Sequence, residues 1–102
     1  MDAIYTPTEI KEKLYPIFDA TPIIRAILFG SYAKGNPSQL SDIDILIDSG
    51  GEIRGIEFFG VLEDITEILR VPVDLIDMSQ LIDGGRIQHE IEETGVVIYE
   101  RT

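Results

Sequence analysis

The spacing of apolar residues along the chain changes several times between a helical and a strand-like period. Near the N-terminus they recur every three or four positions, which predicts a helix that begins near Pro7 or Thr8. We expect Thr8 to cap it. The apolar face of this helix consists of Ile10, Leu14, Ile17 and Phe18. Pro16 lies inside the pattern, so the helix should kink there or end early.

Two strands are predicted next. Residues 23–29 form an almost continuous apolar run, which is typical of a buried strand, and the run stops at the pair Gly30 and Ser31. A short helix over residues 31–34 and a loop over residues 35–39 follow. Residues 41–48 then alternate strictly, as a strand with two different faces does. One face carries Ile43, Ile45 and Ile47, and the other carries Asp42, Asp44 and Leu46.

The C-terminal half continues the alternation of helices and strands. The pattern predicts a long helix over residues 54–69, a strand over 73–76 and a short helical turn over 79–83. A helix over 86–93 and a final strand over 96–99 complete the chain. Helices and strands therefore alternate throughout, which indicates a single α/β domain over residues 1–102.

The long helix has an apolar face wider than packing on one sheet requires. Its main stripe is predicted to contain Ile56, Phe59, Leu62, Ile65 and Leu69, and the residues that widen it are Phe58, Val61 and Ile68. We interpret this face chiefly as core, while an interface with a second copy or a partner remains the alternative. The final strand has the same ambiguity, because it can form the margin of the sheet.

Composition and charge limit the classes of function. Hydrophobic residues make up 44% of the 102 positions, as in folded domains, and the formal net charge is −11. An acidic chain lacks the clustered Lys and Arg that direct binding to nucleic acid or an anionic membrane requires, although a nucleotide can bind through a divalent cation. Without cysteine there is neither a disulfide nor a thiolate metal site, and without an apolar leader we expect a cytoplasmic protein.

Three acids and a turn carry the candidate chemistry. Asp42 and Asp44 project from the same face of one strand, close enough to share a divalent cation. Asp74 joins that face if the third strand pairs beside the second. Gly30 allows a close approach of the backbone to a phosphate, and the Ser31 hydroxyl and the amides after it can donate to phosphate oxygens.

Each of these features also has a purely structural interpretation. A turn glycine before a capping serine is common, and an Asp-x-Asp pair can be the solvated face of an edge strand. A register shift of one residue would exchange Asp74 for Asp77, which we interpret as a helix cap before Ser79. His89, the only histidine, lies among polar residues of a short helix and is expected to be solvated. It is the combination of turn and acids, at this spacing, that favours a catalytic site.

The combination resembles a known superfamily. Gly30 and Ser31, ten intervening residues and then Asp42-x-Asp44 are similar to the signature of the DNA polymerase β-type nucleotidyltransferases. The segments GSYAKG (residues 30–35) and SDIDILI (residues 41–47) resemble the minimal nucleotidyltransferases, the MNT group, many of which are antitoxins of HEPN-domain proteins. The resemblance covers nearly the whole chain and implies an α/β (α+β) fold with a small mixed sheet of about four strands flanked by helices.

The resemblance also implies roles for individual residues. Asp42, Asp44 and Asp74 would hold two Mg²⁺ ions, with Asp74 also helping to activate the acceptor hydroxyl, and Gly30 and Ser31 would grip the triphosphate of ATP. Lys34 stands where many members have Arg, which keeps a positive charge near the phosphates but loses bidentate donation.

The expected function is transfer of AMP from ATP to a hydroxyl, by in-line attack on the α-phosphate with release of pyrophosphate. The resemblance implies that the acceptor is a HEPN-type RNase toxin, which the modification neutralises. One alternative is a non-catalytic antitoxin that acts by complex formation, and another is a small-molecule nucleotidyltransferase. The short chain disfavours the last, because it has no second domain to enclose a small acceptor. Self-association and a complex with the partner are both compatible with the sequence.

Overall fold

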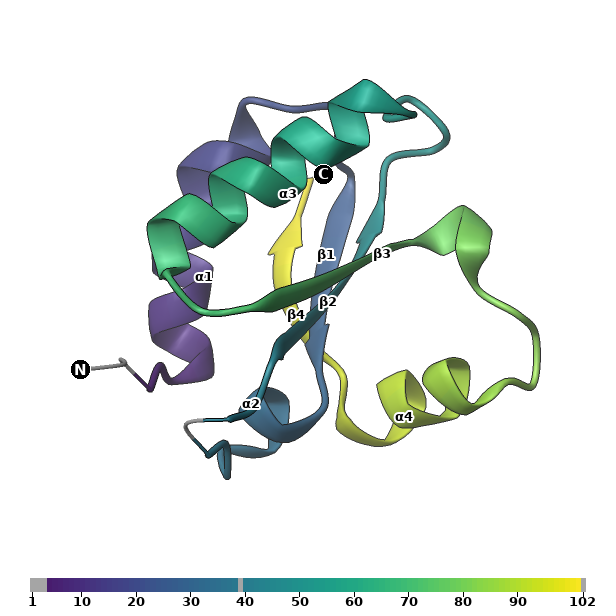
Figure 1. Ribbon diagram of the computed structural model, residues 1–102. Helices are drawn as coiled ribbons and strands as arrows, with labels where there is room; N and C mark the ends of the chain where they lie inside the picture. Colours follow the sequence, from purple (N-terminus) through teal and green to yellow (C-terminus); the bar gives the residue numbers. More distant parts are fainter. Residues whose placement is uncertain (1–3, 39, 102) are drawn as a thin grey trace.

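The computed structural model describes residues 4–38 and 40–101. Its elements follow the predicted order of alternating helices and strands (Figure 1). They are α1 (Pro7–Asp19), β1 (Arg25–Phe29), α2 (Ser31–Lys34), β2 (Ile43–Asp48), α3 (Ile56–Leu69), β3 (Val73–Asp77), the 3-10 helix η1 (Met78–Gln80), α4 (Arg86–Thr94) and β4 (Val96–Glu100). None of the described helices is long and apolar enough to cross a lipid bilayer.

The four strands form one mixed sheet in the order β3-β2-β1-β4. β1 pairs antiparallel with β2 and β4, and β2 pairs parallel with β3. A parallel pair needs a crossover connection, which α3 supplies. The mixed sheet of about four strands flanked by helices is therefore confirmed, and β4 is an edge strand.

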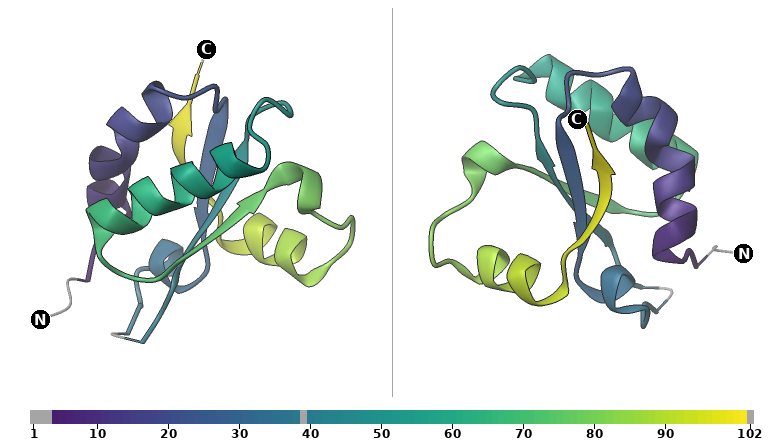
Figure 2. Two further views of the ribbon diagram at one scale, coloured as in Figure 1. Left: turned by 45° about the horizontal axis from the view of Figure 1, so that its top comes forward. Right: turned by 180° about the vertical axis from the view of Figure 1, so that it is seen from behind.

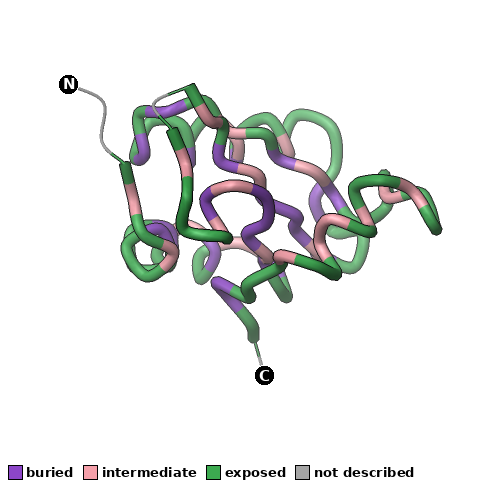
Figure 3. The backbone as a smooth tube through the Cα atoms, turned by 90° about the horizontal axis from the view of Figure 1, so that it is seen from below, coloured by how far each residue is buried: buried purple, intermediate pink, exposed green. Residues whose placement is uncertain are grey.

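The helices lie on opposite faces of the sheet. α1 and α3 pack against each other on one face, and α4 lies on the other face against β1 (Figure 2, right). The predicted alternation of β2 is confirmed, because Ile43, Ile45 and Ile47 are fully buried in the core formed with α1 and α3. The buried segments accordingly run through the centre of the molecule (Figure 3). Asp44 therefore points to the opposite face, where α4 lies.

The predicted cap of α1 is wrong, and of the two outcomes predicted at Pro16 the early end does not occur. The cap is Thr6 rather than Thr8: Glu9 N donates to Thr6 Oγ1 at 3.1 Å, while Thr6 N donates to Glu9 Oε1 at 2.9 Å. This reciprocal pair is a capping box, and it places Pro7 at the first helical position. The helix also continues through Pro16 to Asp19. Phe18, two residues after Pro16, is fully buried, and its packing outweighs the hydrogen bond lost at Pro16.

The apolar stripe of α3 is rotated from the predicted one. Val61, Ile65 and Leu69 are buried, but Ile56 and Phe59 are 88% and 66% exposed. The helix begins at Ile56, after Gly55, rather than at Arg54. A face this wide contains more than one possible stripe, and contact with α1 and β3 selects which one is buried.

Candidate functional site

The sheet register places two of the predicted site acids side by side. Asp44 of β2 pairs with Asp74 of β3, and residues paired across parallel strands point to the same face of the sheet. Asp44 is half-buried and Asp74 is exposed. Asp44 also pairs with Phe29, the last residue of β1, so the acidic pair lies beside the turn that begins at Gly30.

The neighbouring acid Asp77 has a structural role. Its Oδ1 accepts hydrogen bonds from Ser79 N at 2.9 Å and from Ser79 Oγ at 2.8 Å, which makes it the N-terminal cap of η1. This confirms the prediction of a cap. The Asp77 carboxylate is therefore occupied by hydrogen bonds to Ser79. Asp74 is the acid of β3 that lies beside Asp44.

Asp42 is placed less closely. It lies just before β2, in extended chain, and is exposed. Within residues 4–38 and 40–101, no three Asp, Glu or His side chains converge as a ready-made metal-binding group. The register of the sheet brings Asp44 and Asp74 together. That Asp42 joins them in one metal-binding pocket stays a prediction.

Gly30 is in close contact with Asp44. Its φ of 79° lies in the region that favours glycine, and a Cβ at this position would overlap Asp44 Oδ2. The Gly30 amide donates to Thr94 Oγ1 at 3.0 Å and is engaged there. The Ser31 hydroxyl, by contrast, makes no hydrogen bond with any described residue. Lys34 is the last residue of α2, and its side chain is exposed to solvent.

A further acid at the site, Glu90 of α4, is not among the residues that the sequence pattern predicts for it. Its Oε1 lies 3.3 Å from the point where a Cβ of Gly30 would stand, so it faces the same gap as Asp44 Oδ2. Glu90 is one of the polar neighbours of His89 along the chain, and this pattern predicts a solvated position. The available signal was its position next to Ile91, at the border of the apolar stripe of α4.

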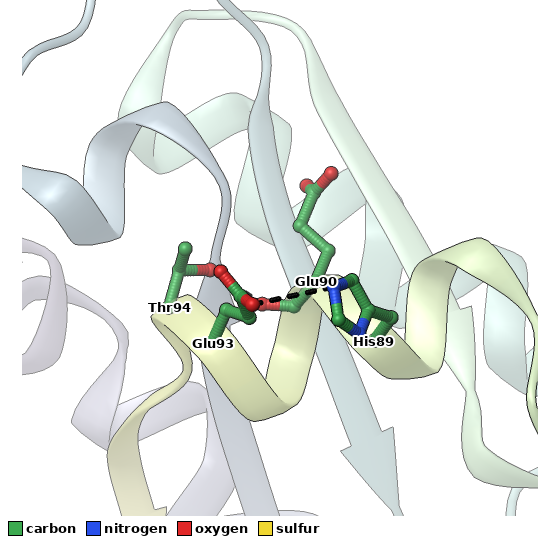
Figure 4. Close-up of polar contacts among 4 residues, drawn as sticks. All are labelled: His89, Glu90, Glu93 and Thr94. Carbon is green, nitrogen blue, oxygen red and sulfur yellow. Dashed lines mark hydrogen bonds and ion pairs between the residues drawn. The ribbon is translucent and has the colours of Figure 1, made fainter.

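His89 itself follows the expectation. It is exposed, and its Nε2 lies 3.2 Å from Glu93 Oε1, one turn along the same helix. Figure 4 shows this pair, with the Glu90 side chain extending away from it.

The acids make the site strongly electronegative. The pKa of Asp44 is raised from 3.8 to about 6, first by burial and then by the charges of Asp74, Glu90 and Asp42. Among the described residues, none of these four carboxylates has an ion-pair or hydrogen-bond partner. Clustered like charges without a counterion favour binding of a cation, and an oxygen-only set of ligands suits a hard divalent ion.

The fold is shared with structures of toxin–antitoxin proteins that are already solved. One, described as "Crystal structure of the toxin-antitoxin with AMP-PNP", matches with a TM-score of 0.75 and 20% identity over 90% of this chain and 74% of that chain. Another, of a tri-AMPylated Shewanella oneidensis HEPN toxin in complex with an MNT antitoxin, matches with a TM-score of 0.69 and 17% identity, over 94% and 74%. Similarity at these identities establishes the shared fold.

Sequence comparison identifies the family. Residues 12–102 match the family "Polymerase beta, Nucleotidyltransferase". Two relatives from Methanocaldococcus jannaschii bear the name "Putative protein adenylyltransferase". One is 33% identical over 73 residues, which are 72% of this chain and 78% of the relative. The other is 34% identical over 94 residues, or 86% and 93%. This chain belongs to the polymerase β nucleotidyltransferase family, and the implied class of enzyme is a nucleotidyltransferase.

Proposed function

We propose that this protein is a Mg²⁺-dependent protein adenylyltransferase that transfers AMP from ATP to a hydroxyl group of a HEPN-type toxin. The observation that carries the proposal is the pair Asp44 and Asp74, which stand side by side against the Gly30 turn without any cationic partner among the described residues. The names of the two relatives support protein modification, and the toxin–antitoxin neighbours support the class of partner.

The residues divide into two groups in this proposal. Asp42, Asp44 and Asp74 would hold two Mg²⁺ ions, and the Ser31 hydroxyl and the Lys34 ammonium would contact the triphosphate. When bound, Mg²⁺ supplies positive charge that stabilises the oxygens of the phosphates during transfer. Gly30 contributes by having no side chain, which leaves the space beside Asp44 open.

The proposed reaction is a balanced transfer. The acceptor oxygen attacks the α-phosphorus of ATP, the new P–O bond forms, and the bond from the α-phosphorus to the bridging oxygen breaks. Pyrophosphate leaves, and the proton of the acceptor hydroxyl passes to the Asp74 carboxylate. Asp74 suits this step because it is exposed at the edge strand β3, where a partner protein can reach it.

ATP binding should require a divalent cation. A chain with a net charge of −11, and a site of unpaired acids, repels a triphosphate unless an ion lies between them. In calorimetry, we expect ATP to bind in the presence of Mg²⁺ and to lose at least about tenfold in affinity in excess chelator. Equal affinity in both buffers would contradict a metal-bridged site.

Transfer to a partner tests the function itself. The protein is incubated with Mg²⁺, ATP labelled at the α-phosphate and a HEPN-type protein encoded beside it. We expect label on the partner, and mass spectrometry should show added AMP on a hydroxyl side chain. ATP labelled at the γ-phosphate is the control and should leave no label. A stable complex that neutralises the partner without any added AMP would instead favour the non-catalytic antitoxin.

A further inference from the structure

Helix α4 carries an acid that points into the proposed site. Glu90 Oε1 and Asp44 Oδ2 both face the space that Gly30 leaves empty. Glu90 is half-buried, and its carboxylate has no ion-pair or hydrogen-bond partner among the described residues. An acid in contact with a phosphate-binding turn would oppose a triphosphate unless a cation compensates for it.

A single hydroxyl fixes α4 relative to the turn. Thr94 Oγ1 accepts from Gly30 N at 3.0 Å and donates to the Glu90 carbonyl oxygen at 2.8 Å. The backbone of Glu90 and the backbone of Gly30 are therefore joined through one residue. Gly95, which follows the helix, packs closely against β1, because a Cβ there would lie 3.1 Å from Ile27 Cγ2. Glu90 is held at the site by tertiary contacts at the end of its helix.

We propose that Glu90 is a fourth acidic residue of the site, a positioning residue that strengthens divalent-cation binding and rejects ATP that carries no cation. This inference rests on the proposed function, because it assumes that a triphosphate lies at the Gly30 turn. Glu90 would act through its negative charge on an ion held by Asp44, and this charge would favour the metal complex of ATP over free ATP.

The matched pair of variants is E90Q and E93Q. Both remove one negative charge from the same helix, but Glu93 is exposed and paired with His89 on the outer side (Figure 4). Affinity for Mn²⁺ or Mg²⁺ without nucleotide is measured by calorimetry, followed by ATP affinity in excess chelator. We expect E90Q to weaken ion binding by about tenfold and to bind metal-free ATP more tightly than the wild type, as loss of one nearby charge implies. E93Q should stay within about twofold of the wild type in both measurements.

The same measurements distinguish a structural role and a failure of the proposed function. Equal ion and ATP affinities in E90Q and E93Q would overturn the role of Glu90, and a lower melting temperature of E90Q alone, with unchanged ion affinity, would make Glu90 structural. If the wild type binds Mg²⁺ and labels its partner, either of these results contradicts only the role of Glu90 and leaves the proposed function standing. If the wild type binds neither Mg²⁺ nor Mn²⁺, the role of Glu90 and the proposed metal-dependent function both fail.

Discussion

Replacement of Asp44 by Asn should abolish AMP transfer while leaving the protein folded. Asn keeps the shape of the side chain but loses the negative charge beside Asp74, on which the proposed metal depends. We expect the rate of label transfer to fall by a factor on the order of 100 or more. D64N is the matched control, because Asp64 is an exposed acid of α3 on the far side of the sheet, and its activity should be unchanged.

Stability should move in the opposite direction to activity. The pKa of Asp44 is raised to about 6, so the folded state disfavours its charged form. Without metal, this destabilisation is absent below about pH 4, grows as the pH rises and is fully present above the folded pKa. In chelator at pH 8, D44N should therefore melt at or above the wild-type temperature. Because Asp44 is half-exposed, solvent screening limits the gain to roughly 1 kcal/mol, or a few degrees.

The contrary result for this variant is equally informative. A melting temperature of D44N that collapses at both pH 5 and pH 8 would assign Asp44 a role in holding the fold. Full transfer activity in D44N would remove it from the proposed metal site. Thermal unfolding in chelator and label transfer with Mg²⁺ therefore need to be measured on the same preparation.

Replacement of Gly30 by Ala should damage both the fold and the site. The glycine has φ 79° and ψ −154°, a combination that residues with a side chain rarely adopt, and the new Cβ would overlap Asp44 Oδ2. We expect the free energy of unfolding, measured in urea, to be about 1–3 kcal/mol lower than that of the wild type. Mg²⁺ binding and label transfer should fall with it, since Asp44 must move away from its position beside Asp74.

Gly35 provides the matched control for Gly30. It has nearly the same φ, at 80°, but a Cβ there meets no atom within 4 Å. In G35A the free energy of unfolding should therefore fall by about 1 kcal/mol, the strain of a side chain in the left-handed conformation. The affinity for Mg²⁺ should be unchanged. Unchanged ion affinity in G30A, or an equal loss of affinity in G35A, would show that the contact between Gly30 and Asp44 does not shape the site.

Local patterns in the sequence predicted the elements because their causes are local. Residues 31–34 form the predicted short helix, since the glycine turn before it and Gly35 after it determine where it starts and ends. The strict alternation of β2 placed Ile43 in the core and Asp44 on the opposite face. Asp77 was recognised as a cap because its partner, Ser79, is only two residues away.

Other features depend on which elements meet in space. The long helix contains several apolar stripes, and only its contact with α1 and β3 decides that Ile65 is buried and Phe59 exposed. Likewise, the alternation predicts Asp42 inside the strand over residues 41–48, whereas β2 begins only at Ile43. Where a strand begins depends on pairing with its neighbours, which the pattern of one segment does not specify.

The sequence by itself determined the alternation of elements, the face of Asp44 and the Gly-Ser turn, because side-chain periodicity and turn chemistry operate over a few neighbouring residues. The tertiary structure decided that β3 pairs beside β2, which brings Asp74 to Asp44 from 30 positions away along the chain. It also decided that α4 docks on the acidic face and brings Glu90 to Gly30 through Thr94. Both placements depend on strand pairing and helix packing between distant segments, and a one-dimensional pattern of polarity does not specify its partner.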